Sequence, residues 1–370
     1  MPNEEFTQCV RRFLKDIGFC HEPFPPYDAQ CWGPFHDWML DVLGPGSSWN
    51  DKQLVELEHV GRGIIERSYP YASTEIKLLY AKLTAIVTLI DDSMEDEAMH
   101  QDIVQFSDRV YQGETQQNPV LALYHEDLKT LSKLHKQDSV LRGLAVVPWI
   151  DHIDACLMEK QLLILECKRS EADGAELIKY SREDSLASKL RVPHYLRSKS
   201  AVSEAYAACI FKPDNQQNLP LTKYMKAIPD IVFFIEATND ILSFYKEELA
   251  GETYNLIHLR TRSIAASGSM CMSGSGPDGI WTPYDTLKLL CDELRDATHR
   301  IDGLLRLEEC EKKLQGESGL NDIDDVDITI AMQWRGWRHG YISWHLECRR
   351  YKLDFLREIV EAEQHGEKSS

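Results

Sequence analysis

Apolar residues recur every three or four positions over several long stretches of the chain, and few stretches alternate with the period of two that is typical of strands. This spacing predicts helices over residues 74–91, 157–167 and 228–249. Ser73 stands just before the first of them, where its hydroxyl can cap a helix. A last long helix is expected from residue 328 to about residue 360, because that stretch contains no proline, with Gly336 and Gly340 as its weak points. The pattern predicts an all-α protein.

Breaks in the helical pattern indicate how the chain is organised. Residues 1–60 contain many prolines and glycines and are expected to form an irregular N-terminal segment packed on a domain of residues 61–370. Serine and glycine dominate residues 263–283, which predicts a loop whose role the sequence leaves open. Neither a repeat nor a marked change of composition divides the rest, so a single domain of packed helices is the simplest interpretation.

Composition narrows the classes of partner and compartment. The 370 residues include 41 Lys+Arg and 60 Asp+Glu, a formal net charge of −19. Nucleic acid and membrane are excluded as main partners, because a nucleic acid or an anionic membrane surface needs clustered positive charge. The ten cysteines form no C-x-x-C pair, and the longest apolar stretch, residues 83–90, is far shorter than the roughly 20 residues of a membrane span. The first residues are acidic and polar, so we expect a cytoplasmic protein with reduced thiols.

Two short motif matches carry little weight. Residues 274–279 fit G-x-G-x-x-G, but no predicted strand precedes them, as a dinucleotide site requires. Residues 322–325 fit the D-x-D-D motif of cyclases that begin by protonation, but they lie in an acidic run for which a solvated face is the better interpretation.

A cluster of acidic residues follows directly on the apolar stretch 83–90. It consists of Asp91, Asp92, Glu95 and Asp96, and on a helix Asp91 and Glu95 share one face. Carboxylates this close repel one another unless a cation neutralises them, and Mg²⁺ typically takes one or two carboxylates together with water and phosphate oxygens. The alternative is a solvated helix end. The apolar stretch before the acids favours a metal site at the edge of an apolar interior.

A second polar pattern lies within the predicted helix 228–249. Asn239, Ser243 and Glu247 recur every fourth residue, so they form one stripe along a helix. An amide oxygen, a hydroxyl and a carboxylate together make an oxygen site with a single negative charge, which suits one Mg²⁺. A chance polar stripe on a solvated face is the alternative, but every position of [ND]-D-[LIV]-x-S-x-x-K-E agrees with the sequence.

In order and spacing, these motifs resemble those of class I terpene cyclases, from about residue 70 to residue 355. The likeness is greatest to the trichodiene synthase-like fungal family, and it depends on residues 239–247 and 339–351. The resemblance implies a single-domain helical bundle around a deep active-site cavity. It also implies three Mg²⁺ ions per site, which hold the diphosphate of a linear prenyl substrate.

The resemblance assigns a role to each motif residue. Asp91 would bridge two of the ions, with Glu95 beside it, and Asn239, Ser243 and Glu247 would hold the third. The expected diphosphate contacts are four residues: Arg197, Lys246, Arg350 and Tyr351. Lys199 competes with Arg197 for its place, and Asp92 would pair with Arg350 when the site closes. Asp91, Arg350 and Tyr351 are the expected catalytic residues.

Carbocation chemistry needs an apolar wall around the reacting chain. The candidates are five apolar or aromatic residues: Tyr80, Val87, Phe233, Phe234 and Tyr341. Trp334, Trp337 and Trp344 lie near the last motif. For each aromatic residue, ordinary core packing is the alternative.

These features predict a lyase of terpenoid secondary metabolism. It would ionise farnesyl diphosphate and cyclise the carbocation to a sesquiterpene hydrocarbon or alcohol, releasing diphosphate. A substrate of ten or twenty carbons stays open. A chain-elongating prenyl transferase is less favoured, because that family carries a second Asp-rich motif where this chain has Asn239, Ser243 and Glu247. A non-enzymatic protein with relic motifs is a further alternative, and a homodimer is left open.

Overall fold

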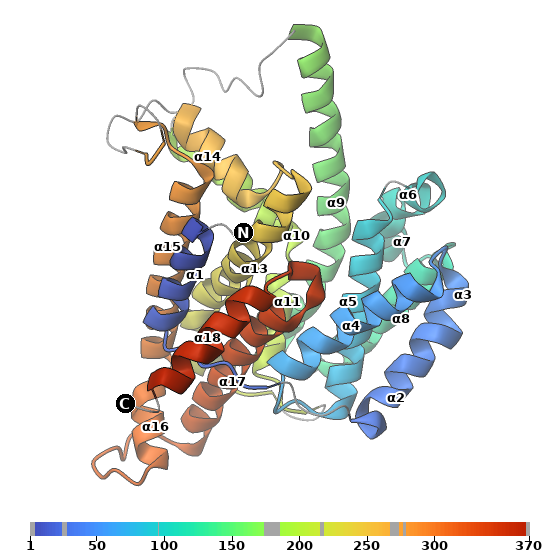
Figure 1. Cartoon of the computed structure of the whole chain (residues 1–370). Coiled ribbons are helices and arrows are strands. Elements are labelled where there is room, and N and C mark those ends of the chain that lie inside the picture. Colours follow the sequence, from blue (N-terminus) through green and yellow to red (C-terminus); the bar gives the residue numbers. More distant parts are fainter. Residues whose placement is uncertain are drawn as a thin grey trace.

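The computed structural model describes residues 4–23, 28–94, 96–173, 186–214, 218–266, 274–276 and 279–367, and every regular element in these ranges is helical (Figure 1). The all-α prediction is confirmed. The helices are α1 (Glu4–Asp16), α2 (Ala29–Trp38), α3 (Gly44–Gly46), α4 (Asp51–Ser68), α5 (Thr74–Asp92), α6 (Glu97–Val104), α7 (Phe106–Gln112), α8 (Pro119–Leu134), α9 (Ser139–Asp173), α10 (Leu186–Ser200), α11 (Ser203–Ile210), α12 (Leu221–Tyr224), α13 (Ile228–Ala250), α14 (Leu256–Ala266), α15 (Pro283–Leu304), α16 (Leu307–Leu314), α17 (Asp325–Glu347) and α18 (Asp354–Glu367). Among these residues, no helix has both the length and the apolar character that a bilayer span requires.

The two helices that carry the motifs begin and end where the sequence predicts. Ser73 caps α5 by accepting a hydrogen bond from the Ile76 amide, and the helix buries residues such as Leu83 and Ile90 before it ends. Helix α13 has a proline in its first turn and ends at Ala250, before Gly251, whose φ of 71° lies in the left-handed region that glycine tolerates. The acidic residues of α5 therefore stand at its last turn.

The motif helices lie at the centre of the bundle. Helix α4 packs between α5 and α17, while α13 packs against α11, α15 and α17. Helix α9 contacts α5, α8, α10 and α11, and it extends past its neighbours at one end (Figure 1). It contains the predicted stretch 157–167 but continues through Pro148, so it is much longer than the periodicity indicates.

Helix α17 approaches α4 unusually closely at two glycines. A Cβ on Gly340 would lie 1.9 Å from the carbonyl oxygen of Arg67, and a Cβ on Gly63 would lie 3.0 Å from Nε1 of Trp344. The helix is continuous through Gly340 and Gly336. The glycine that the sequence marks as a weak point is therefore a contact point between helices.

The prediction of one helix from 328 to about 360 was wrong. Helix α17 ends at Glu347, Cys348 is extended, a 3-10 turn (η4, Arg349–Tyr351) follows, and Lys352 adopts a φ of 58° before α18 begins. The carboxylate of Glu347 pairs with Arg67 of α4, with 2.6 Å between Oε1 and Nη2. Contacts between distant segments, rather than a local proline, accompany this break.

The N-terminal segment is also more regular than expected. Residues 1–60 contain α1, α2, α3 and the greater part of α4, which runs across residue 60. Asp28 caps α2, and Asn50 forms a reciprocal capping pair with Gln53 at the start of α4. These caps lie among the prolines and glycines from which an irregular N-terminal segment is predicted. The prediction that this segment is irregular was wrong, because it is largely helical. The division of the chain at residue 60 stays a prediction.

The two weak motifs fall in connecting segments. Of residues 263–283, the first four are the end of α14, and residues 267–273 and 277–278 lie outside the described part. Residues 274–276 and 279–282 contain no strand, and Thr282 caps α15. Asp322 pairs with Arg306 at 2.7 Å, and Asp324 caps α17, so both have structural partners at an exposed surface.

Candidate active site

Residues from α4, α5, α9, α10, α11, α13, α17 and η4 surround one cavity of about 280 Å³. That volume is close to the lower end of small-molecule sites, which is about 300 Å³. The cavity is lined by Val60, Ile64, Thr84, Val87, Thr88, Asp91, His152, Arg197, Ser200, Ala201, Val202, Tyr206, Ile235, Asn239, Ser243, Lys246, Glu247, Tyr341, Trp344, Arg350 and Tyr351. Another cavity, of about 330 Å³ between α1 and α15, contains none of the motif residues.

The polar stripe of α13 faces this cavity. Asn239, Ser243 and Glu247 all line it, and Lys246 lies beside them. The fourfold spacing places them on one side of the helix, while neighbours such as Ile241 and Leu242 are fully buried in the core. The carboxylate of Glu247 lies 3.4 Å from Nζ of Lys246. The stripe therefore presents oxygen ligands and a cation to the same space.

The end of α5 meets the same cavity. Asp91 lines it, and Asp92 lies 3.5 Å from Arg350. The turn after Asp92 is fixed to α9, because Nζ of Lys160 donates a 2.6 Å hydrogen bond to the carbonyl oxygen of Met94. Glu95 lies outside the described residues. The structure thus brings the acidic end of α5 and the polar stripe of α13 to one cavity, although they are far apart in sequence.

Arg197 of α10 projects to the α13 stripe. Its Nη2 donates a 2.9 Å hydrogen bond to Oδ1 of Asn239, and its Nε lies 2.9 Å from Asp240. Burial raises the pKa of Asp240 to about 6 although Arg197 opposes the shift, and the Asp240 charge in turn raises the pKa of Arg197. Lys199, its competitor in the sequence, instead pairs with Asp151 at 2.6 Å and does not line the cavity.

Hydrogen bonds to His345 and Tyr351 fix the orientation of the Asn239 amide. Nδ1 of His345 lies 2.8 Å from the carbonyl oxygen of Tyr341, which can only accept, so that nitrogen carries the proton and Nε2 is an acceptor. The Asn239 amide nitrogen then donates to Nε2 of His345 at 3.2 Å and to the Tyr351 hydroxyl at 3.1 Å. Burial lowers the pKa of His345 to about 3, so the ring stays neutral. The amide oxygen is thereby turned toward Arg197.

The turn η4 brings two more predicted residues to the cavity. Arg350 and Tyr351 both line it, and the charge of Asp92 raises the pKa of Arg350. The ammonium of Lys246 lies 5.9 Å from the centre of the Tyr351 ring. Arg197, Lys246 and Arg350 thus place three cations around one space.

The structure corrects part of the predicted wall. Val87 and Tyr341 line the cavity, whereas Tyr80, Phe233 and Phe234 do not. The ring of Tyr80 packs behind the wall, 6.5 Å from Tyr206, which takes the lining position. Phe234 contacts Trp334 edge-on at 5.2 Å, and Phe233 packs on the hydrophobic core while partly exposed. Of the three tryptophans, only Trp344 lines the cavity.

Sequence reasoning missed several wall residues. Val60 and Ile64 come from α4. The capping residue Asn50 is the feature of the sequence from which the start of this helix could have been predicted. Val202 joins α10 to α11 with a φ of 54°, which is strained for a β-branched residue and which no sequence pattern indicates. The break at Val202 leaves Ser200 and Ala201 lining the cavity as well.

The chain resembles known proteins over most of its length. It is 30% identical over 316 residues to "Terpene synthase BipA" of Cochliobolus sativus, and the aligned region covers 85% of this chain and 80% of that protein. It is 27% identical over 361 residues to "Alpha-cuprenene synthase COP6" of Coprinopsis cinerea, and the aligned region covers 95% of this chain and 92% of that protein. No protein-family model matches the chain.

Solved structures share the fold. The linalool/nerolidol synthase from Streptomyces clavuligerus superposes with a TM-score of 0.56 at 15% identity, covering 88% of this chain and 99% of that chain. The same enzyme in complex with 2-fluorogeranyl diphosphate gives a TM-score of 0.57 at 15% identity, covering 87% and 100%. At these identities the likeness shows a common helical architecture.

Proposed function

The chain belongs to the terpene synthases, and we propose that it is a magnesium-dependent sesquiterpene synthase that ionises farnesyl diphosphate, cyclises the carbocation and releases diphosphate. The observation that carries this proposal is that Asp91 of α5 and the Asn239, Ser243 and Glu247 stripe of α13 line one cavity. The narrower likeness to trichodiene synthase stays a prediction.

The donor set fits magnesium. Asp91 and Glu247 offer carboxylate oxygens, Asn239 an amide oxygen and Ser243 a hydroxyl, and all four residues line the cavity. We propose that Asp91, with Glu95, holds two Mg²⁺ ions and that the α13 stripe holds a third. When bound, these ions would neutralise the charge that develops on the diphosphate as the carbon–oxygen bond breaks.

Three cations support binding and departure of the diphosphate. Arg197 and Arg350 carry planar guanidinium groups, which match phosphate oxygens with paired hydrogen bonds, and Lys246 adds a compact charge. Tyr351 also lines the cavity, and its hydroxyl accepts a hydrogen bond from the Asn239 amide. These donors are held in place before the substrate arrives, as catalysis by fixed dipoles and charges requires.

The other lining residues suit a hydrocarbon chain. Val60, Ile64, Val87 and Ile235 provide apolar surface that excludes water from a carbocation. The aromatic lining residues are Tyr206, Tyr341, Trp344 and Tyr351. An aromatic face attracts a passing cation by about 0.5–2 kcal/mol. The fifteen-carbon substrate is favoured because the relative α-cuprenene synthase is named for a sesquiterpene.

Incubation with geranyl, farnesyl or geranylgeranyl diphosphate tests the proposal. We expect Mg²⁺-dependent release of diphosphate and cyclic fifteen-carbon products from farnesyl diphosphate, detected by mass spectrometry, and no release after chelation. Preference for the ten- or twenty-carbon substrate would correct the chain length. A requirement for a second, homoallylic diphosphate would point to a prenyl transferase, and no release from any substrate would refute the proposal.

A further inference from the structure

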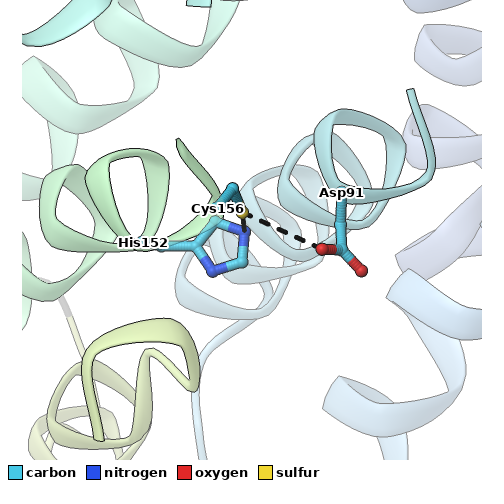
Figure 2. A group of neighbouring side chains, drawn as sticks. All are labelled: Asp91, His152 and Cys156. Carbon is cyan, nitrogen blue, oxygen red and sulfur yellow. Dashed lines mark hydrogen bonds between the residues drawn. The ribbon is translucent and has the colours of Figure 1, made fainter. Parts of the chain in front are cut away.

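Three different metal-ligating side chains come together where α5 meets α9. Figure 2 shows Cys156 between His152 and Asp91. The Cys156 sulfur lies 3.5 Å from Nε2 of His152 and 3.8 Å from Oδ1 of Asp91, and the three atoms all lie within 4.8 Å of one another. His152 and Cys156 are one helical turn apart, so α9 presents both on one face. Asp91 and His152 line the cavity, whereas Cys156 is buried.

Two acceptors of this group, Nε2 of His152 and the Asp91 carboxylate, face the single hydrogen of the Cys156 thiol. Nδ1 of His152 lies 2.6 Å from the carbonyl oxygen of Ser200, which can only accept, so this nitrogen carries the proton. Nε2 is therefore an acceptor, and it faces the sulfur. The Cys156 thiol has one hydrogen, but both Nε2 and the Asp91 carboxylate are placed to accept it. One of the two acceptors is always left without it.

The two spacings that involve the Cys156 sulfur match the edges of a tetrahedral zinc site. With Zn–S of about 2.3 Å and Zn–N or Zn–O of about 2.0 Å, adjacent ligand atoms lie about 3.5 Å apart. The two distances to the Cys156 sulfur, 3.5 and 3.8 Å, agree with that value. Magnesium does not suit this group, because it prefers oxygen ligands alone. The Ser200 carbonyl already orients the His152 ring, as a partner of a metal-bound imidazole does.

The geometry points to a site for one thiophilic divalent cation, such as Zn²⁺, held by Asp91, His152 and Cys156 and reached from the cavity, with water as the fourth ligand. On binding, the metal–sulfur bond replaces the bond between sulfur and hydrogen, and the proton passes to solvent. The two negative ligands then balance the charge of the cation. This site is distinct in its chemistry from the oxygen stripe of α13, but it shares Asp91 with the proposed magnesium site.

Sharing Asp91 gives the site a consequence, which rests on the proposed function. A cation bound by His152 and Cys156 withdraws the Asp91 carboxylate from magnesium. Zn²⁺ should therefore inhibit turnover, and raising Mg²⁺ should relieve the inhibition. Binding itself needs neither substrate nor activity, so the binding test stands even if the proposed reaction is wrong.

Titration of the chelator-treated, untagged chain with Zn²⁺ alone tests the site by calorimetry. We expect one Zn²⁺ per chain, and with Co²⁺ in its place an absorption band from charge transfer between thiolate and metal. Cys156→Ser should abolish that band, and Cys156→Ser and His152→Gln should each weaken Zn²⁺ binding at least tenfold. Saturating Mg²⁺ should weaken Zn²⁺ binding in the wild-type chain.

Matched controls are Cys20→Ser, in the segment after α1, and His299→Gln, in α15; both side chains are exposed and neither lines the cavity. Both should bind Zn²⁺ as the wild-type chain does. Circular dichroism checks that each variant is folded. Absence of the Co²⁺ thiolate band in the wild-type chain would overturn the proposal, and this result does not depend on any variant. Equal Zn²⁺ affinity in Cys156→Ser and Cys20→Ser would overturn it as well.

Discussion

The guanidinium of Arg350 lies 3.5 Å from the carboxylate of Asp92, from Nη2 to Oδ1, although 258 residues separate them in the chain. The contact joins the last turn of α5 to the turn η4 beside the cavity. It is long for a hydrogen bond, and both side chains are partly exposed, so it contributes little to stability. Its effect is to hold a planar cation next to Asp91.

Arg350→Lys tests the need for that planar group. The charge remains, but the paired hydrogen bonds to phosphate are lost, so kcat/KM for farnesyl diphosphate should fall at least tenfold, or about 1.4 kcal/mol. The free energy of unfolding should change by less than about 1 kcal/mol. Arg349→Lys is the control, because Arg349 is exposed on the same turn and does not line the cavity. Equal activity of the two variants would contradict the role of Arg350.

The α13 stripe allows a comparison of adjacent residues. Glu247 lines the cavity, whereas Glu248 pairs with His258 at 3.1 Å and does not line it. Glu247→Gln removes the negative charge of the proposed third metal site, so turnover should fall at least a hundredfold and the Mg²⁺ concentration for half-maximal rate should rise. Glu248→Gln should stay within about twofold of wild type. Steady-state kinetics over a range of Mg²⁺ distinguishes them, and similar losses in both would refute the assignment.

Two helical glycines should respond to alanine with opposite signs. At Gly340 the added Cβ would overlap the Arg67 carbonyl oxygen at 1.9 Å, so Gly340→Ala should lower the free energy of unfolding by about 2–3 kcal/mol or more. At Gly143, in α9, nothing lies within 4 Å of the position that a Cβ would take. Gly143→Ala should therefore raise stability by about 0.5–1 kcal/mol. Urea denaturation measures both, and a neutral Gly340→Ala would show that α4 and α17 can separate freely.

A buried histidine should make the fold sensitive to acid. His135 is fully buried, and within the described part of the chain neither of its ring nitrogens has a hydrogen-bond partner. Burial, aided by the charge of Lys212 and opposed by Asp138, lowers its pKa to about 4. As the pH falls from 6.5 to 4, His135 becomes protonated in the unfolded chain but stays neutral in the folded chain. Stability should therefore fall by about 1.4 kcal/mol per pH unit in that range.

His135→Leu isolates this contribution. The variant lacks the titrating group, so its free energy of unfolding should depend less steeply on pH between 6.5 and 4 than that of wild type. The difference between the two slopes, measured by urea denaturation, should approach the value above. Parallel pH profiles would show that His135 takes up its proton equally in both states.

The sequence predicted the parts of the site that local patterns encode. Asp91 and the α13 stripe could be predicted because each pattern is local. Carboxylates after an apolar helix, or polar residues at a fourfold spacing, can be recognised within a few helical turns. The spacing of Asn239 and Glu247 also fixed which side of α13 faces the cavity. The fold class followed from the same periodicity.

What the sequence did not predict depends on contacts between distant segments. The end of α17 at Glu347 has no proline or glycine, and Arg67 of another helix binds that carboxylate. The left-handed Val202 likewise has no local signature. Periodicity marked Tyr80 and Phe234 as buried, but it could not say whether they face the cavity or the core behind it.

The most direct test of the account is a double-mutant cycle on Asp91 and Glu247. Mg²⁺-dependent diphosphate release from farnesyl diphosphate is measured for wild type, Asp91→Asn, Glu247→Gln and the double variant, all checked for folding. If both residues serve one metal-bound diphosphate, each single variant loses almost all activity and the double variant loses little more than either. Single losses that are small and multiply in the double variant would contradict a shared site.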